Sequence, residues 1–386
     1  MSIAYLNQSA HHIHPELELN TTNGCDSYPI PKNDMNYKIK WSGIMQGISS
    51  WSKKGFAYCP TPVKRFVIQE QNNTGMKKKS SMMQNLSNLG VKSISYKKMV
   101  DKYTLPESQF ININGTMVHY CDQGQGPVLL LLHGMLASLH TWNEWVKILS
   151  PHFRIIRLDL PGFGLTKHIT KEPNRDNYIQ FLNDFVEKLN LNQFVIAGNS
   201  IGGYIAWNYS VDYSHKVTQL ILIDAVGYPQ NLPWVVNFVN LPIFRTIASM
   251  ITPRIFIDQN VRTIYGDKNK VTDELIDLYF DMVLSSDNRG AFIDLFRTLK
   301  IECSSSNLSK GITEIKVPTL LMWGKNDPWV PVEVVQDWER DLTSSQTIIY
   351  DGVGHVPMEE IPLQTANDAY RFLMVNDQSI NKTIKK

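Results

Sequence analysis

The stretch that decides the fold is residues 194–203, Phe-Val-Ile-Ala-Gly-Asn-Ser-Ile-Gly-Gly. It begins as an apolar, β-branched run typical of a buried strand, breaks into Gly-x-Ser-x-Gly, and leads into a segment with the composition of a helix. A sharp strand-to-helix turn pushes a serine side chain outward, and glycines beside it remove Cβ atoms that would clash. We therefore predict that Ser200 is a nucleophile, supported by Gly198 and Gly202.

The partners that a nucleophilic serine needs lie downstream. A base must take the hydroxyl proton, and a carboxylate must hold the tautomer of that base. Asp327 lies in a loop after the apolar run 317–323, and His355 lies in a glycine-flanked loop after a short strand predicted at 346–350. We predict Asp327 as the triad acid and His355 as the triad base.

Two further motifs extend the pattern. Residues 128–132, Val-Leu-Leu-Leu-Leu, run into His-Gly-Met-Leu-Ala-Ser at 133–138, and residues 157–164 read Arg-Leu-Asp-Leu-Pro-Gly-Phe-Gly. With these motifs and the chain order Ser, Asp, His, the sequence resembles the α/β-hydrolase family from about Ser108 to Leu373.

The resemblance implies where a developing oxyanion would bind. Its donors would be the backbone N–H groups of Met135 and of Ile201, the residue after the nucleophile. Gly134 would let the backbone approach the oxyanion closely. We expect His133, at the end of the predicted strand, to fix this loop by hydrogen bonding.

Other polar residues near strand ends offer alternatives. Asp159 and Asp224 each follow an apolar strand-like run, and Asp224 could be the acid of a variant triad. Asp327 is preferred because its Gly-x-x-Asp loop matches the commonest acid position of the family. Asn199, beside the nucleophile, is expected to serve the turn conformation.

Strand and helix patterns alternate along the chain, which predicts an α/β fold: a mostly parallel sheet covered by helices on both faces. The α/β-hydrolase core is expected over 105–227 and 309–375. Strands are predicted at 109–113, 116–121, 128–132, 153–158, 194–198, 220–224, 319–323 and 346–350, and helices at 142–149, 177–189, 201–209, 332–342 and 363–373.

A long insertion separates the two parts of the core. Residues 228–308 are rich in apolar and helix-forming types, and we predict a helical lid that contributes to an acyl-binding pocket. The apolar positions expected to pack or to line the pocket are Trp234, Val235, Phe238, Val239, Leu241, Phe244, Ile247 and Met250.

The first 104 residues differ in composition from the remainder of the 386. They hold 14 Lys and Arg against 6 Asp and Glu, concentrated between Lys53 and Lys102. We predict a basic, partly disordered extension ending in a short helix at 95–103, with weak contact to anionic lipid as the alternative. Residues 376–386 form a basic C-terminal tail. The extension lacks the motifs of a nucleic-acid binder.

The remaining features concern location and cofactors. The cysteines, at 25, 59, 121 and 303, do not suggest a disulfide framework, and no signal peptide or bilayer-length apolar run is evident. We predict a cytoplasmic protein, peripheral membrane contact being the alternative. No metal cluster, phosphate loop or dinucleotide fingerprint is found, so no cofactor is implied.

These observations predict a serine hydrolase that cleaves carboxylic esters with an apolar acyl group through an acyl-enzyme on Ser200. Ser200 stands where related dehalogenases and epoxide hydrolases carry aspartate, which argues against those activities. Two alternatives stay open. One is a carbon–carbon bond hydrolase, whose elbow resembles Gly-Asn-Ser-x-Gly-Gly. The other is a hydrolase-like protein that binds a ligand without turning it over. The oligomeric state stays open.

Overall fold

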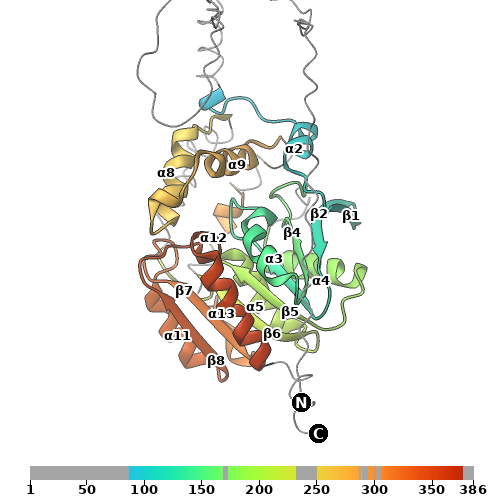
Figure 1. The fold of residues 1–386 in the computed structure, drawn as a ribbon, viewed down its shortest axis with the longest axis vertical. Helices are drawn as coiled ribbons and strands as arrows, with labels where there is room; N and C mark the ends of the chain where they lie inside the picture. Colours follow the sequence, from blue (N-terminus) through green and yellow to red (C-terminus); the bar gives the residue numbers. More distant parts are fainter. Residues whose placement is uncertain are drawn as a thin grey trace, which may run out of the picture. The chain divides into compact units, whose positions relative to one another are not determined.

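The computed structural model describes residues 87–167, 173–231 and 250–376, apart from positions 287, 289–293, 299, 301–304 and 306 (Figure 1). The basic extension predicted over 1–104 is therefore outside the described residues up to position 86, as is most of the C-terminal tail. Of the apolar positions predicted for the lid, Met250 alone is described, and its side chain is exposed.

An eight-stranded sheet forms the centre of the described chain, with strand order β1-β2-β4-β3-β5-β6-β7-β8. β1 and β2 form an antiparallel hairpin, β2 runs antiparallel to β4, and all other neighbours are parallel. The prediction of a mostly parallel sheet is confirmed. The strands are β1 (Ser108–Ile113), β2 (Thr116–Gln123), β3 (Val128–Leu132), β4 (Arg154–Leu158), β5 (Phe194–Asn199), β6 (Val217–Ile223), β7 (Thr319–Gly324) and β8 (Ser345–Tyr350).

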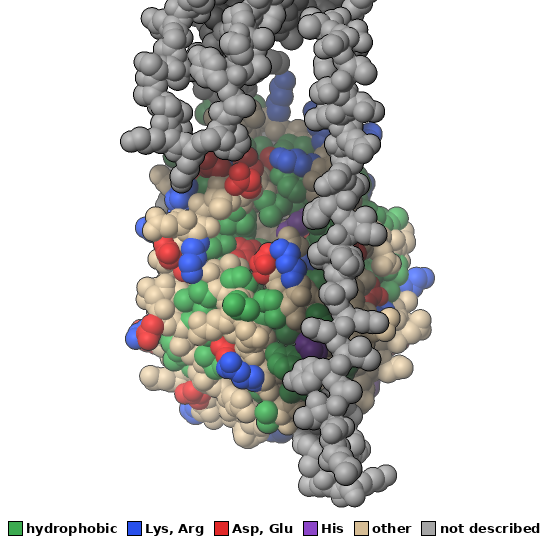
Figure 2. Space-filling view, viewed as in Figure 1, with side chains coloured by type: hydrophobic (Ala, Val, Ile, Leu, Met, Phe, Trp, Pro, Cys, Tyr) green, Lys and Arg blue, Asp and Glu red, His purple; other side chains and the backbone are tan. Residues whose placement is uncertain are grey.

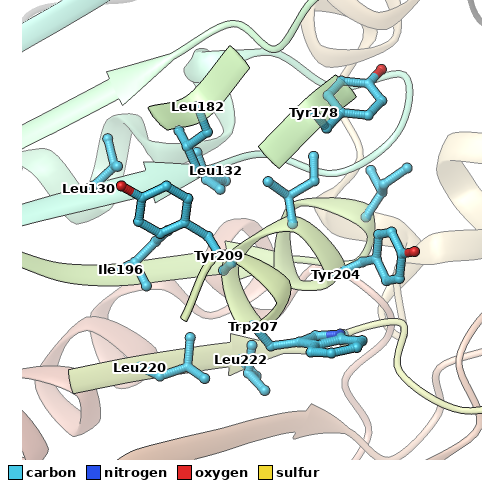
Figure 3. Packing of buried hydrophobic residues seen from close by; sticks show 14 of the residues in the cluster. Leu130, Leu132, Tyr178, Leu182, Ile196, Tyr204, Trp207, Tyr209, Leu220 and Leu222 are labelled. Atoms are coloured by element: carbon cyan, nitrogen blue, oxygen red, sulfur yellow. The ribbon is translucent and has the colours of Figure 1, made fainter. Parts of the chain in front are cut away.

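Helices cover both faces of this sheet. Alternate residues of each strand point to opposite faces, so Leu130 and Leu132 join a core with α4, α5 and α11, whereas Leu129 and Leu131 join one with α3 and α13 (Figures 1 and 3). In Figure 3, Tyr204, Trp207 and Tyr209 of α5 lie among strand residues of the first core. The helices are α2 (Tyr96–Tyr103), α3 (Asn143–Leu149), α4 (Arg175–Lys188), α5 (Ile201–Asp212), α8 (Arg254–Ile264), α9 (Asp273–Leu284), α11 (Val335–Asp341), α12 (Pro357–Glu360) and α13 (Pro362–Val375).

The predicted helices match the observed ones within three residues at each end, apart from one segment that begins as a 3₁₀ turn and one short helix that was missed. The segment predicted as one helix over 332–342 begins as a 3₁₀ turn, Val332–Val334, before α11, and such turns are common at helix starts. The four-residue helix α12 was not predicted, because one turn is too short to show a hydrophobic period.

The described part of the predicted insertion places α8 and α9 between β6 and β7. The predicted short helix before the core exists as α2, whose buried Met99 packs with Leu165 and with Met282 of α9. Lys102 and Tyr103 both donate hydrogen bonds to Asp281 at 2.7 Å. α2 thus binds to the inserted helices.

The described surface carries charges of both signs. Figure 2 shows basic and acidic side chains interspersed on the visible described face. None of the helices that the structure describes combines the length and the apolarity needed to cross a bilayer.

Candidate active site

Ser200 occupies the tight turn between β5 and α5. Its backbone has φ 55° and ψ −117°, a strained conformation for a residue with a Cβ. A Cβ on Gly198 would overlap the carbonyl of Gly202, and one on Gly202 would overlap the carbonyl of Leu132. Both glycines are therefore required by the packing of this turn.

Asp327 and His355 meet at the same end of the sheet. His355 Nδ1 lies 2.6 Å from Asp327 Oδ2, and both side chains are almost completely buried. Asp327 Oδ1 accepts the backbone N–H groups of Trp329 (2.7 Å) and Val330 (3.1 Å). A carboxylate held this way makes Nδ1 the protonated ring nitrogen and leaves the Nε2 lone pair available.

Ser200 and His355 line the same cavity. No described residue forms a hydrogen bond with the Ser200 hydroxyl. The nucleophile-to-base contact is often long in unliganded enzymes. The structure thus places Ser200 and His355 on one cavity and His355 against Asp327.

The loop after β3 lies directly against the nucleophile. A Cβ added to Gly134 would lie 3.3 Å from Ser200 Cβ and 2.6 Å from Asn199 Oδ1, so only glycine fits here. Met135 lines the cavity, and Ile201 begins α5. The first amides of a helix have no partner within it, so the Ile201 N–H is available at the turn.

His133 fixes the loop that carries Gly134. Its Nε2 accepts the backbone N–H of Leu160 at 2.9 Å, so Nδ1 carries the proton and donates to the Gly134 carbonyl at 2.7 Å. Complete burial lowers the pKa of His133, which keeps the ring neutral. These bonds match the loop-fixing role expected from the sequence.

The cavity wall is mostly apolar and is shared between strand ends and inserted helices. Ile257, Val261 and Ile264 of α8 and Val283 of α9 face Met135, Leu136 and Val356 across it. Its described polar lining residues are Asn199, Ser200, Asn260, Tyr279 and His355, with no Lys, Arg, Asp or Glu among the described ones. Such a surface suits an uncharged, apolar ligand group.

Three contacts of the His355 loop escaped sequence reasoning. The Asn199 side chain donates to the carbonyl of His355 at 3.0 Å and to that of Ile223 at 3.1 Å. The N–H of His355 donates to the carbonyl of Ile264, at the end of α8, at 2.7 Å. Glu360 accepts the N–H of Gly354 at 2.9 Å. Of the residues in these contacts, Asn199 alone could have been suspected from the sequence, because it precedes Ser200.

Glu359, the neighbour of Glu360, is half-buried and lines a second cavity with Thr141 and Tyr279. Tyr265 donates to it at 2.6 Å and Tyr279 at 3.3 Å, and Thr141 bonds it as well. Burial raises the pKa of Glu359, and the three hydroxyl donors oppose the increase. No sequence signal pointed to this cluster.

Asp159, an alternative acid, belongs to a separate chain of hydrogen bonds. Ser108 Oγ lies 2.7 Å from His119 Nε2, and His119 Nδ1 lies 2.7 Å from Asp159 Oδ2. Asp159 also accepts the N–H groups of Leu139 and Leu165. Although burial alone would raise the pKa of Asp159, His119 and these amide donors lower it to about 2. Ser108 lines neither the cavity of Ser200 nor the one lined by Glu359, which indicates a structural link.

Asp224, the other alternative acid, lies beside the first cluster. One carboxylate oxygen of Asp224, one of Asp327 and one ring nitrogen of His355 lie within 4.8 Å of one another. Among the described residues this is the group most suited to a metal ion. The direct hydrogen bond between His355 and Asp327 already uses the ligand atoms that a cation would need, so the geometry fits a proton relay better.

Comparisons with known proteins agree with this architecture. The chain is 28% identical over 269 residues to 2-hydroxy-6-oxo-6-(2'-aminophenyl)hexa-2,4-dienoic acid hydrolase of Metapseudomonas resinovorans, covering 69% of this chain and 90% of that protein. It is 26% identical over 264 residues to the monoacylglycerol lipase ABHD6 of Bos taurus, covering 65% and 76%.

A solved structure shows the same arrangement. The serine hydrolase involved in carbazole degradation superimposes with a TM-score of 0.61 at 27% identity, over 69% of this chain and 98% of that one. The sequence model of the alpha/beta hydrolase fold matches residues 127–362, more than half of the chain. The chain therefore belongs to the α/β-hydrolase fold family.

Proposed function

We propose that this protein is a serine hydrolase that cleaves carboxylic esters with an apolar acyl group. One observation carries the proposal: Ser200, on a strained strand-to-helix turn, shares an apolar cavity with His355. His355 Nδ1 lies 2.6 Å from Asp327 Oδ2. This arrangement supplies a nucleophile, a base with a fixed tautomer and a place for the acyl chain.

The reaction follows from the positions of these groups. Ser200 Oγ attacks the ester carbonyl while His355 Nε2 takes its proton, and Asp327 stabilises the imidazolium that forms. The N–H groups of Met135 and Ile201, with the positive end of the α5 dipole, bind the oxyanion. His355 then protonates the departing alkoxide, an acyl-enzyme forms, and water activated by His355 releases the acid. The inserted helices α8 and α9 act as the lid over the acyl group.

A fluorophosphonate probe tests the nucleophile. We expect labelling of the wild-type protein and of Ser108→Ala, and none of Ser200→Ala, because Ser200 lines a cavity together with His355 and Ser108 does not. Labelling that persists in Ser200→Ala contradicts the assignment. Retention of a hydrophobic ester intact for hours by the wild-type protein would instead favour a non-catalytic ligand-binding role.

A second candidate is hydrolysis of a carbon–carbon bond in a dienoic acid, favoured by the similarity to the Metapseudomonas enzyme. A substrate carboxylate needs a cation or an amide to bind it. Both N–H groups of the Asn199 amide already donate to backbone carbonyls, so the described lining offers the Asn260 amide and no cation, which favours an ester. Comparing kcat/KM for p-nitrophenyl esters of graded chain length with that for a ring-fission dienoate decides between them.

The N-terminal extension carries a separate proposal. Its basic composition suits weak contact with anionic lipid, in a protein that is otherwise cytoplasmic. Sedimentation with phosphatidylserine vesicles, comparing the full chain with a form whose lysines at 77–79 are replaced by glutamine, tests it.

A further inference from the structure

A second buried carboxyl group stands beside the acid of the proposed triad. Asp224 follows β6 with φ 45°, and its side chain is inaccessible to solvent. Its Oδ1 accepts the N–H of Gly324 at 2.9 Å, whereas its Oδ2 has no hydrogen-bond partner in the part of the chain that the structure describes. The group is close enough to Asp327 and His355 for all three to offer atoms within 4.8 Å of one another.

Two carboxylates so close together and shielded from water cannot both carry a charge. The titratable groups around Asp224 are Asp327 from the loop after β7, His355 from the loop after β8, Glu360 from α12 and Tyr350 at the end of β8. None of them supplies a positive charge while His355 is neutral. One of the two aspartates must therefore hold a proton.

The hydrogen bonds decide which one. Asp327 accepts three N–H groups, from His355, Trp329 and Val330, and such donors stabilise the charged form. Asp224 accepts one, from Gly324. Burial first, and then the charge of Asp327, raise the pKa of Asp224 well above its ordinary value.

We propose that Asp224 is a positioning residue that stays protonated and donates a hydrogen bond from its carboxyl group to Asp327. This bond orients the Asp327 carboxylate toward His355 and draws off part of its negative charge, so the imidazolium is stabilised less than by an isolated aspartate. The inference rests on the proposed function only in taking His355 as the base.

The test uses Asp224→Asn and Asp224→Leu. The Asn amide can still donate to Asp327 and accept from Gly324, whereas Leu fills the space without donating. We measure the His355 titration by NMR of ring-labelled protein in a Ser200→Ala background, and the acid limb of the pH profile of kcat/KM in proteins that retain Ser200.

We expect Asp224→Leu to move the His355 midpoint upward by about 0.5–1 pH unit, because Asp327 then acts on the imidazole alone. Asp224→Asn should stay within about 0.3 unit of the unsubstituted protein. An ionised Asp224 would give the opposite sign, since both substitutions would remove a negative charge and lower the midpoint. Equal shifts in the two variants, or no shift in Asp224→Leu, also overturn the proposal.

If Asp224→Leu does not fold, the His355 midpoint in Asp224→Asn still tests whether Asp224 is protonated. Only an ionised Asp224 predicts that this midpoint moves downward. The NMR titration needs no turnover. Failure to hydrolyse any ester, combined with the expected titration shifts, would therefore refute the proposed function and leave this inference standing.

Discussion

Glu360 is expected to fix the histidine loop to the inserted helices, and Glu360→Gln tests this directly. Its buried carboxylate accepts three backbone N–H groups: Gly266 and Asp267, after α8, at 2.9 and 2.8 Å, and Gly354, beside His355, at 2.9 Å. Oε2 serves Gly266 and Gly354, while Oε1 serves Asp267. One side chain thus joins two loops that are far apart in the sequence.

The magnitude follows from these bonds. In Glu360→Gln the amide oxygen can still accept the N–H groups of Gly266 and Gly354. The new NH₂ group then faces the N–H of Asp267, and two donors cannot form a hydrogen bond with each other. One hydrogen bond to a charged acceptor, of about 1.5–3 kcal/mol, is lost, and two others weaken to about 1 kcal/mol each. The neutral Gln side chain avoids the cost of burying a charge, which offsets part of the lost stability. We expect the free energy of unfolding to fall by about 2–4 kcal/mol.

Activity should fall as well, because Gly354 sets the position of the His355 ring. A displacement of about 1 Å in a catalytic group costs on the order of 100-fold, so a loss of about 10–100-fold in kcat/KM is expected. Urea unfolding and ester kinetics measure the two effects. Glu339→Gln, an exposed change of the same chemistry on α11, is the control and should stay within about 0.5 kcal/mol. A Glu360→Gln protein as stable and as active as this control refutes the reasoning.

Two other predictions concern the proposed oxyanion loop and the buried acid. Gly134→Ala places a Cβ 2.6 Å from Asn199 Oδ1, which displaces the oxyanion loop, and kcat/KM should fall about 100-fold with little change in fold, as checked by kinetics and circular dichroism. Because the pKa of Asp224 is raised in the folded protein, the unfolded chain releases this proton at lower pH. Stability should therefore fall as the pH rises above the ordinary aspartate value, and urea titrations of Asp224→Asn should show a weaker fall.

Sequence patterns predicted the centre of the sheet because its central strands are buried on both faces. Runs such as 128–132 and 320–323 are continuously apolar, and each is followed by a loop with a polar or glycine residue. The short helix α12 gave no such signal. Its position depends on Pro357 at its start and on tertiary contacts of Met358.

The candidate site was predictable only in part, for a physical reason. The proposed nucleophile, acid and base could be predicted from local turns, because Ser200, Asp327 and His355 each follow a strand. Contacts such as Asn199 with the His355 carbonyl depend on how loops from different strands meet, and no local pattern records that meeting. Asp224 follows a strand, which predicted that it would lie near the candidate site. Its proposed protonation depends on the hydrogen bonds that Asp224 and Asp327 accept, and the sequence carries no sign of them.

These contacts would let His355 act as the proposed base without reordering its loop. Its N–H donates to Ile264, its carbonyl accepts from Asn199, and Nδ1 is bonded to Asp327. Among the described residues, Nε2 is the one hydrogen-bonding atom of His355 without a protein partner, and the ring borders the cavity that Ser200 also lines. Preorganisation of this kind removes the entropy cost of aligning the base with the nucleophile. The inserted helix α8, through Ile264, is part of that alignment, so a change in α8 should alter the rate of proton transfer as well as the binding of the acyl group.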